Sequence, residues 1–431
     1  MKKYYLYGIG MLLFSSTATA QLDENTPVDR EKFPNFKPVF NPERSLLKKS
    51  KQSRALRQNR PVYVNNADTP YFPPIFNQDG GSCSSAASVA YMLTYELNSV
   101  RGTDASKDEN MLPTHFTWSN YFSPGQGQNA IAAGNGVPNI IVYEGRTFSR
   151  LFGNQDWKDT DFGWMQGYDK WYSAMFNRTT HSANFPKGLN TEEGRELVKD
   201  WLWNHCGDSD FRAGGTVNVM LGITGSKDQQ IPQTPTNKEV GVAGKWYIAE
   251  WSEKLDHQMT IVGYDDRIEF DLDGNGIAGE KDKDEVGAWI IANSWGAGWK
   301  NKGFIYCPYK NSYTYKNENG PGGWWFPEMH FVRKDYRPLR TMKITMEYSK
   351  RSEIALSAGI STDLKATTPE KTTGFKHFTY AGNGGNEVDG ETPMLGKWLT
   401  GMNYAPMEFG YDLTDLSAEF DTRRALKYFF I

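Results

Sequence analysis

Three short segments of the chain carry the residue types that are needed to activate a thiol. They are residues 77–83 (NQDGGSC), 256–264 (DHQMTIVGY) and 293–299 (NSWGAGW). Cys83 becomes a strong nucleophile once it is ionised, and a helix N-terminus or an adjacent imidazole lowers the pKa of a thiol. His257 supplies the imidazole, and Asn293 can accept its N–H and fix the ring. The order Cys, His, Asn therefore predicts acyl transfer through an activated thiol.

Two further side chains fit the same chemistry. Gln78, five residues before Cys83, can direct its side-chain N–H₂ group at a developing oxyanion, with the backbone N–H of Cys83 as the second donor. Trp295 can cover the hydrogen bond between His257 and Asn293, which excludes water and strengthens the bond.

The segment after Cys83 has the apolar spacing of a helix, and the stripe consists of Ala86, Val89, Ala90, Leu93 and Leu97. Ser82 is the expected N-cap residue of this helix. Cys83 then lies in the first turn, where the backbone N–H groups and the helix dipole favour a thiolate.

The elements that must carry His257 and Asn293 are strands. A helix is predicted at residues 191–205, with Thr191 as its N-cap. Strands are predicted at residues 216–221 and 246–250, from His257 onward, and at residues 288–292 and 303–307. Strands that follow helices in this way predict an α+β fold.

The N-terminus has the pattern of an export signal. Lys2 and Lys3 precede an apolar run over residues 4–14, and the segment ends in Ala-x-Ala at Ala20. We therefore expect a signal peptide over residues 1–20 that is cleaved after Ala20, of a type that indicates a bacterium, and a secreted or periplasmic protein. The run is too short to span a bilayer, and no transmembrane segment is expected elsewhere.

Charge and cysteine content exclude several classes. A formal net charge of −3 gives no indication of a nucleic-acid partner. Three cysteines are too few for a disulfide scaffold; with Cys83 as the working thiol, a single bridge between Cys206 and Cys307 stays open. The oligomeric state is not fixed by the sequence.

The chain divides into four parts. Residues 21–60 are polar, with a basic run from Lys48 to Arg60, and we interpret them as a pro-segment or linker. Residues 61–335 hold the three thiol motifs and form the predicted catalytic domain. Residues 342–348 and 354–360 alternate with period two, so residues 336–431 are predicted to form a separate, sandwich-like β accessory domain.

Together, residues 77–83, 256–264 and 293–304 resemble the papain-like (C1 family) cysteine peptidases of the secreted bacterial type, over about residues 61–333. The resemblance implies a helical subdomain with Cys83 facing a β-rich subdomain with His257 and Asn293, and a substrate cleft between them. The chain departs from the family's Cys-Gly-Ser/Ala-Cys-Trp/Tyr pattern, because it has Gly-Ser-Cys-Ser at residues 81–84.

The resemblance implies a role for each residue. Cys83 would be the nucleophile, His257 the general acid and base, Asn293 the residue that orients the imidazole, and Gln78 the oxyanion donor. Peptide bonds of protein or peptide substrates would be hydrolysed through a thioester, with no cofactor for catalysis.

A second candidate site is an acidic loop at residues 271–282 (DLDGNGIAGEKD). Its oxygen ligands have the spacing of a twelve-residue calcium loop, with glycine at position six. The predicted ligands are Asp271, Asp273, Asn275, the backbone carbonyl of Ile277, and Asp282. We therefore expect a structural Ca²⁺, and a plain acidic turn is the alternative.

Two other functions stay open from the sequence. The same triad would serve a thiol amidase or acyltransferase that acts on cell-wall or other peptides, because only the acyl acceptor differs. A catalytically silent, calcium-dependent binding protein would keep the fold and use the C-terminal domain.

Overall fold

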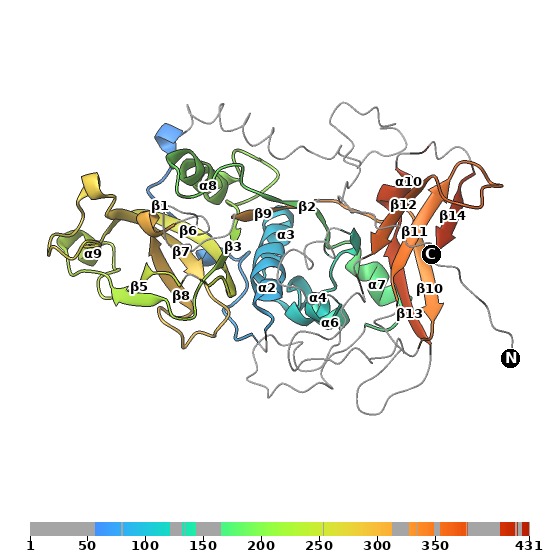
Figure 1. The fold of residues 1–431 in the computed structure, drawn as a ribbon, viewed down its shortest axis with the longest axis horizontal. Helices are drawn as coiled ribbons and strands as arrows, with labels where there is room; N and C mark the ends of the chain where they lie inside the picture. The colour runs from blue at the N-terminus through green and yellow to red at the C-terminus, as the bar shows by residue number, and fades with distance from the viewer. Residues whose placement is uncertain are drawn as a thin grey trace.

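The computed structural model describes residues 57–78, 81–120, 132, 134–143, 165–252, 254–312, 327–332, 334–348, 354–375, 377, 406–418, 420 and 425–430 (Figure 1). The predicted signal peptide and most of the predicted pro-segment lie outside the described residues.

A nine-stranded, mostly antiparallel sheet forms the scaffold of the predicted catalytic domain. Eight of its strands follow the order β2-β9-β3-β6-β7-β8-β5-β4, and β1 pairs with β6. The strand bounds are β1 Tyr63–Asn65, β2 Thr179–Asn184, β3 Val217–Leu221, β4 Lys227–Gln230, β5 Trp246–Glu250, β6 His257–Glu269, β7 Val286–Ala292, β8 Phe304–Pro308 and β9 Glu328–Val332. The long strand β6 and its neighbour β7 form the centre of this sheet. β6 begins at the predicted site residue His257, and β7 ends one residue before Asn293.

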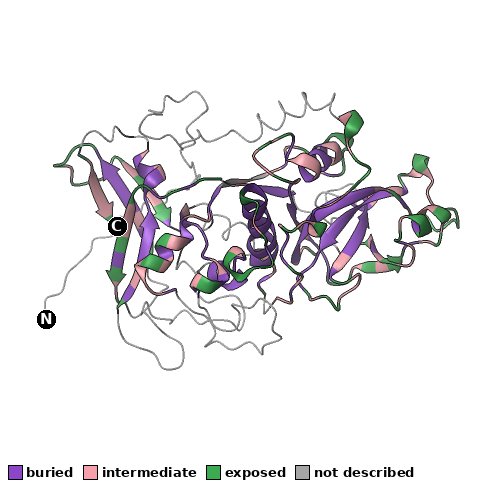
Figure 2. Ribbon diagram, turned by 180° about the vertical axis from the view of Figure 1, so that it is seen from behind, coloured by how far each residue is buried: buried purple, intermediate pink, exposed green. Residues whose placement is uncertain are grey.

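One long helix runs beside the sheet, from Cys83 to Arg101. It comprises α2 (Cys83–Ser85), a π-helical stretch (Ala86–Leu93) and α3 (Thr94–Arg101). Every residue of the π-helical stretch is buried, which Figure 2 shows as an unbroken buried colour along the helix. A helix that is apolar all round must be covered on all sides. In Figure 1 it lies between the large sheet and the C-terminal strands.

Three contacts fasten this helix to the sheet side. Thr260 of β6 donates its hydroxyl to the carbonyl of Ala87 at 3.0 Å. Tyr95 donates to the carbonyl of Gly214 at 2.6 Å, and the buried Glu96 carboxylate accepts the Thr216 backbone N–H at 2.8 Å. These bonds fix the helix, and with it Cys83, relative to β6.

A close backbone approach completes the sheet at Gly263. A Cβ atom at Gly263 would lie 2.0 Å from the carbonyl oxygen of Val64 in β1, which no side chain tolerates. Glycine is therefore required for β1 to pair with β6 at this point.

Shorter helices pack around the sheets and the long helix. They are α4 Thr114–Asn120, α6 Ile140–Tyr143, α7 Tyr168–Ala174, α8 Glu192–Asn204, α9 Pro235–Glu239 and α10 Thr414–Ser417, with 3₁₀ turns at Arg57–Asn59, Asn66–Asp68, Asp108–Asn110, Lys281–Lys283 and Tyr309–Asn311. Thr191 caps α8 as expected, because its hydroxyl accepts the backbone N–H of Gly194 at 3.0 Å. Arg60, at the end of the basic run, pairs with Glu196 and Asp200 of α8 at 2.7 and 2.8 Å.

The C-terminal region forms two small antiparallel sheets. The first pairs β10 (Thr341–Met346) with β13 (Met407–Asp412), and the second has the order β12-β11-β14. The bounds of the second sheet are β11 Leu356–Ser361, β12 Lys371–Phe375 and β14 Lys427–Phe430. The apolar side chains of both sheets share one cluster with the long helix, α4 and α7.

The architecture is α+β, as expected, with a helical part that carries Cys83 and a β-rich part that carries His257 and Asn293. Across the described ranges, no helix is both long enough and apolar enough to cross a membrane.

Candidate active site

His257 and Asn293 meet because of the register between β6 and β7. β6 begins at His257, β7 ends at Ala292, and Thr260 pairs with Ala292 across the two strands. The Nε2 atom of His257 lies 2.7 Å from Oδ1 of Asn293, and both side chains are buried. An amide oxygen at this distance accepts the ring N–H and leaves Nδ1 as the other working nitrogen.

Gln78 is held against the segment that follows Asn293. Its backbone N–H donates to the carbonyl of Ser294 at 2.7 Å, and its side-chain Oε1 accepts the Ser294 hydroxyl at 2.5 Å. Ser294 therefore contacts the oxygen end of the Gln78 side-chain amide and holds this side chain beside the segment that follows Asn293. Ser294 was not predicted as a site residue, although it lies inside the motif at residues 293–299.

Cys83 lies at the first residue of the long helix and is partly exposed. Its helix α2 packs against β6, and the backbone N–H of Gln258, the residue after His257, hydrogen-bonds to the thiol sulfur. This contact places the thiol at the start of β6. Ser82, the predicted N-cap, occupies the cap position but makes no side-chain capping bond, so the cap interaction expected from the sequence is not formed.

The protonation of the two reactive groups is set mainly by burial. Burial raises the pKa of the Cys83 thiol, and the hydrogen bond from the Gln258 backbone opposes this rise only in part. Burial lowers the pKa of His257, against the hydrogen bond to Asn293. The hydrogen bonds at the thiol therefore do not offset the effect of desolvation on its pKa. Each group alone favours its neutral form.

Two aromatic side chains enclose the His–Asn pair. The rings of His257 and Trp295 have centroids 4.6 Å apart, and Trp295 is 36% exposed, so it forms an outer cover as predicted. Tyr91, buried in the long helix, donates its hydroxyl to the backbone carbonyl of Asn293 at 3.0 Å. The sequence did not identify Tyr91, because it looks like one more apolar residue of the helix. Only its hydroxyl sets it apart from the apolar stripe.

The other two cysteines take no part in this site. Cys206 and Cys307 are both buried, and none of the three cysteines is in a disulfide, so the bridge that the sequence left open is not formed. Burial raises the pKa of the Cys307 thiol to about 12, which keeps it protonated and unreactive.

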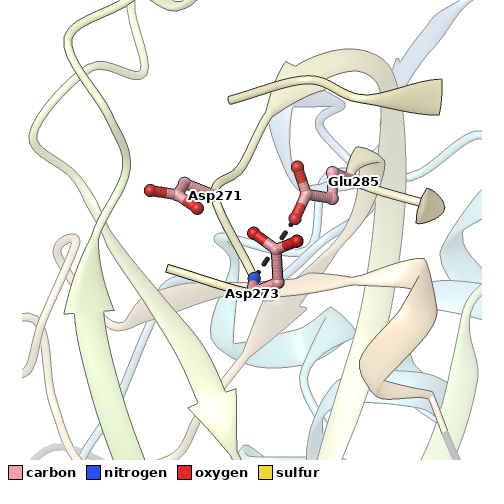
Figure 3. A group of neighbouring side chains, drawn as sticks. All are labelled: Asp271, Asp273 and Glu285. Carbon is pink, nitrogen blue, oxygen red and sulfur yellow. Dashed lines mark hydrogen bonds between the residues drawn. The ribbon is translucent and has the colours of Figure 1, made fainter. Parts of the chain in front are cut away.

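The acidic loop lies at the opposite end of the β6–β7 pair. The structure brings Asp271 and Asp273 together with Glu285 (Figure 3). Each of the three residues has one carboxylate oxygen within 4.8 Å of an oxygen of the other two. Asp282 is exposed on the turn Lys281–Lys283 and is not part of this group. Asn275 uses Oδ1 to accept the Ile277 backbone N–H at 2.7 Å. Glu285, which sequence reasoning missed, lies three residues beyond the twelve-residue pattern.

The comparisons with known proteins agree with this site. Residues 236–320 match the family model "Papain family cysteine protease". That segment contains both His257 and Asn293. The comparison with curated proteins gives no match.

Solved structures with a similar chain path are also cysteine proteases. The bromelain protease from Ananas comosus, in complex with the E64 inhibitor, is 15% identical, with 63% of this chain and 99% of that chain covered and a TM-score of 0.35. Xylellain, a cysteine protease from Xylella fastidiosa, is 14% identical, with 65% and 89% covered and a TM-score of 0.37.

The family match thus confirms the resemblance to papain-like cysteine peptidases over the segment that contains His257 and Asn293. Residues 236–320, which carry His257 and Asn293, match the papain family of cysteine proteases within a chain of α+β architecture.

Proposed function

We propose that the protein hydrolyses peptide bonds of protein or peptide substrates with Cys83 as nucleophile, His257 as general acid and base, Asn293 as the orienting residue and Gln78 as oxyanion donor. The observation that carries this proposal is the buried hydrogen bond of 2.7 Å between His257 and Asn293, next to the start of the helix that bears Cys83. No cofactor takes part in the reaction.

The first step creates two opposite charges together. Burial disfavours a lone thiolate and a lone imidazolium, but transfer of the thiol proton to Nδ1 of His257 forms both at once, and each stabilises the other. The thiolate sulfur then attacks the carbonyl carbon of the substrate, and the carbonyl electrons move onto oxygen.

Gln78 and the backbone N–H of Cys83 are the donors for that oxygen. The Ser294 hydroxyl anchors Oε1 of Gln78 at 2.5 Å, so the N–H₂ group needs no reorganisation when the negative charge develops. Donors that are already oriented lower the barrier more than donors that must first turn.

His257 then returns the proton to the leaving amine, and the C–N bond breaks to leave a thioester on Cys83. Water attacks the thioester while His257 accepts its proton, and the C–S bond breaks to release the carboxylic acid and the free thiol. Asn293 keeps the imidazole in one orientation through both halves of the reaction.

The N-terminal sequence supports export. The basic start, short apolar run and Ala-x-Ala end over residues 1–20 have the composition of a bacterial secretory signal cleaved after Ala20. The proposed site of action is therefore outside the cytoplasm, where extracellular or periplasmic proteins are the substrates. Residues 21–60 are proposed to act as a pro-segment or linker.

A peptidyl epoxide and a casein substrate test the proposal together. Wild-type protein should be alkylated once, at Cys83, as located by mass spectrometry of its peptides, and should release casein fragments at a rate that falls as alkylation proceeds. The matched control is Cys206→Ser, which removes a buried, inert thiol and should leave labelling unchanged.

The two alternatives predict different results. An amidase or acyltransferase would be labelled at Cys83 but would leave casein intact. A silent binding protein would be neither labelled nor active, and that result would overturn the proposal altogether.

A further inference from the structure

Three carboxylates converge on one space where β6 and β7 are joined. Asp271, Asp273 and Glu285 each offer one oxygen within 4.8 Å of the other two. In Figure 3 the Glu285 side chain extends toward the two aspartates. Carboxylates at this separation repel one another, and a cation bound at about 2.3–2.6 Å from each oxygen would span the same distances.

Glu285 makes this group different from an ordinary acidic turn. It is 0% exposed, and its Oε1 accepts the backbone N–H groups of Leu272 and Asp273 at 2.8 and 3.2 Å. Its Oε2 is buried and has no hydrogen-bond partner in the described part of the chain, and neither does the buried Oδ1 of Asp271. A buried carboxylate oxygen without a donor or cation is costly.

The neighbouring side chains do not supply the missing positive charge. Lys283 donates to Asp273 at 2.7 Å and to Glu280 at 2.8 Å, so its ammonium sits on the exposed side of the group. Tyr247, a buried phenol near Asp271 and Glu285, donates its hydroxyl to Gln229 at 2.8 Å. Lys283 and Tyr247 therefore donate to other groups, and neither donates to Oε2 of Glu285 or Oδ1 of Asp271.

We propose that Asp271, Asp273 and Glu285 form a binding site for a single Ca²⁺ ion. The ligands are oxygen atoms only, which favours Ca²⁺ or Mg²⁺ over the nitrogen- and sulfur-loving transition metals. Of these two ions, Ca²⁺ fits better, because its coordination shell is larger and more flexible and tolerates carboxylates that are arranged irregularly on a loop. Glu285 takes the place that the sequence pattern assigned to Asp282.

The site acts on the stability of the β6–β7 pair rather than on the reaction. Glu285 precedes β7 directly, and the backbone N–H of Phe270, just after β6, donates to the Glu285 carbonyl at 2.9 Å. A cation held by Glu285 and the two aspartates would therefore tie the ends of both strands together. This inference does not depend on the proposed peptidase activity.

The experiment measures binding and melting of the full chain in a Cys83→Ser background, which prevents self-digestion. Calcium chloride is titrated calorimetrically, and melting is compared in excess chelator and in about 10 mM CaCl₂, roughly 10–100 times a dissociation constant of ~10⁻⁴–10⁻³ M. We expect saturable binding of one ion and a melting temperature that rises by about 2–5 °C. The same concentration of MgCl₂ should produce a smaller rise.

Three variants assign the ligands. Glu285→Gln keeps the shape of the side chain and should abolish the calcium-dependent rise, whereas the matched control Asp282→Asn should retain it. Asp271→Asn, at a more exposed position, serves as the second test should Glu285→Gln fail to fold, and it should also lose the rise. No calcium response in the background protein, or a response lost with Asp282→Asn and kept with Asp271→Asn, would overturn the proposed site.

Discussion

The two ends of the β6–β7 pair both bury polar side chains, but they differ in how those side chains interact. At the end with His257 and Asn293, buried polar groups pair with one another, through the His–Asn bond at 2.7 Å and the Gln78–Ser294 bond at 2.5 Å. At the end with Glu285, three carboxylates face one another. The difference is one of charge, since the catalytic groups are neutral when buried, whereas the acidic group carries like charges.

Neither end is fully satisfied within the described residues. Asn293 leaves Nδ2 buried without a partner, as Glu285 leaves Oε2. An unpaired neutral N–H₂ group costs about 1–3 kcal/mol, whereas an unpaired ionised carboxylate costs more. The cost of the unpaired group is therefore larger at the acidic end, where a bound cation would remove it.

The largest expected effect separates the two ends completely. Cys83→Ser should lower kcat/KM for peptide hydrolysis by at least about 10³-fold, because a hydroxyl is not ionised by a neighbouring imidazole. The calcium-dependent change in melting temperature should be the same as in the wild type, since the thiol lies at the other end of β6. Turnover above about a tenth of the wild-type rate would contradict the thiol mechanism.

The second expectation divides the work within the catalytic end. His257→Ala removes the group that moves protons and should cost about 10²–10⁴-fold in kcat. Asn293→Ala removes only the group that orients the ring, so its loss should be at least about tenfold smaller. Equal losses in two variants with the same melting temperature would show that Asn293 does more than orient the imidazole.

The sequence predicted several secondary-structure elements well because their signals are local. The bounds of β5 agree with the prediction at residues 246–250, and Thr191 caps α8 as expected. The apolar stripe that follows Cys83 is part of the long helix. Each of these features depends on the spacing of nearby residues, which is visible in the sequence itself.

The features that the sequence missed depend on contacts between distant segments. Glu285 joins Asp271 only because β6 and β7 pair in one register, and a linear twelve-residue pattern therefore selects Asp282 instead. Ser294 reaches Gln78 across 216 positions of the chain. The C-terminal strands share a core with the long helix, which no period-two pattern could reveal.

A smaller effect is expected when the cation is removed from the active enzyme. His257 and Glu269 lie at opposite ends of β6, on the order of 40 Å apart for an extended strand of this length. Chelation should therefore leave kcat within about twofold at temperatures well below melting, while shortening the half-life of activity near the melting temperature. Immediate loss of turnover in the cold, restored by CaCl₂, would show that the two ends are coupled.

The smallest effect concerns the pH dependence of stability at the catalytic end. Burial lowers the pKa of folded His257 below the ordinary value of about 6.5, so the unfolded chain binds the proton more readily. The stabilisation from the neutral ring is fully present above about pH 6.5 and is lost as the pH falls below it. In the Cys83→Ser background, His257→Gln should make this loss shallower by at most about 1.4 kcal/mol per pH unit.

Two other histidines set the slope that should remain in that experiment. His115 and His377 are buried, and burial lowers the pKa of each to about 3. Their contribution is lost with the same sign, from about pH 6.5 down to about pH 3. We would measure the free energy of unfolding by chemical denaturation at pH 7, 6 and 5. It should depend on pH in the same way in the two proteins above about pH 6.5 and differ between them below that pH. Identical slopes throughout would mean that His257 takes up its proton in the folded protein as easily as in the unfolded chain, and that burial does not keep the catalytic imidazole neutral.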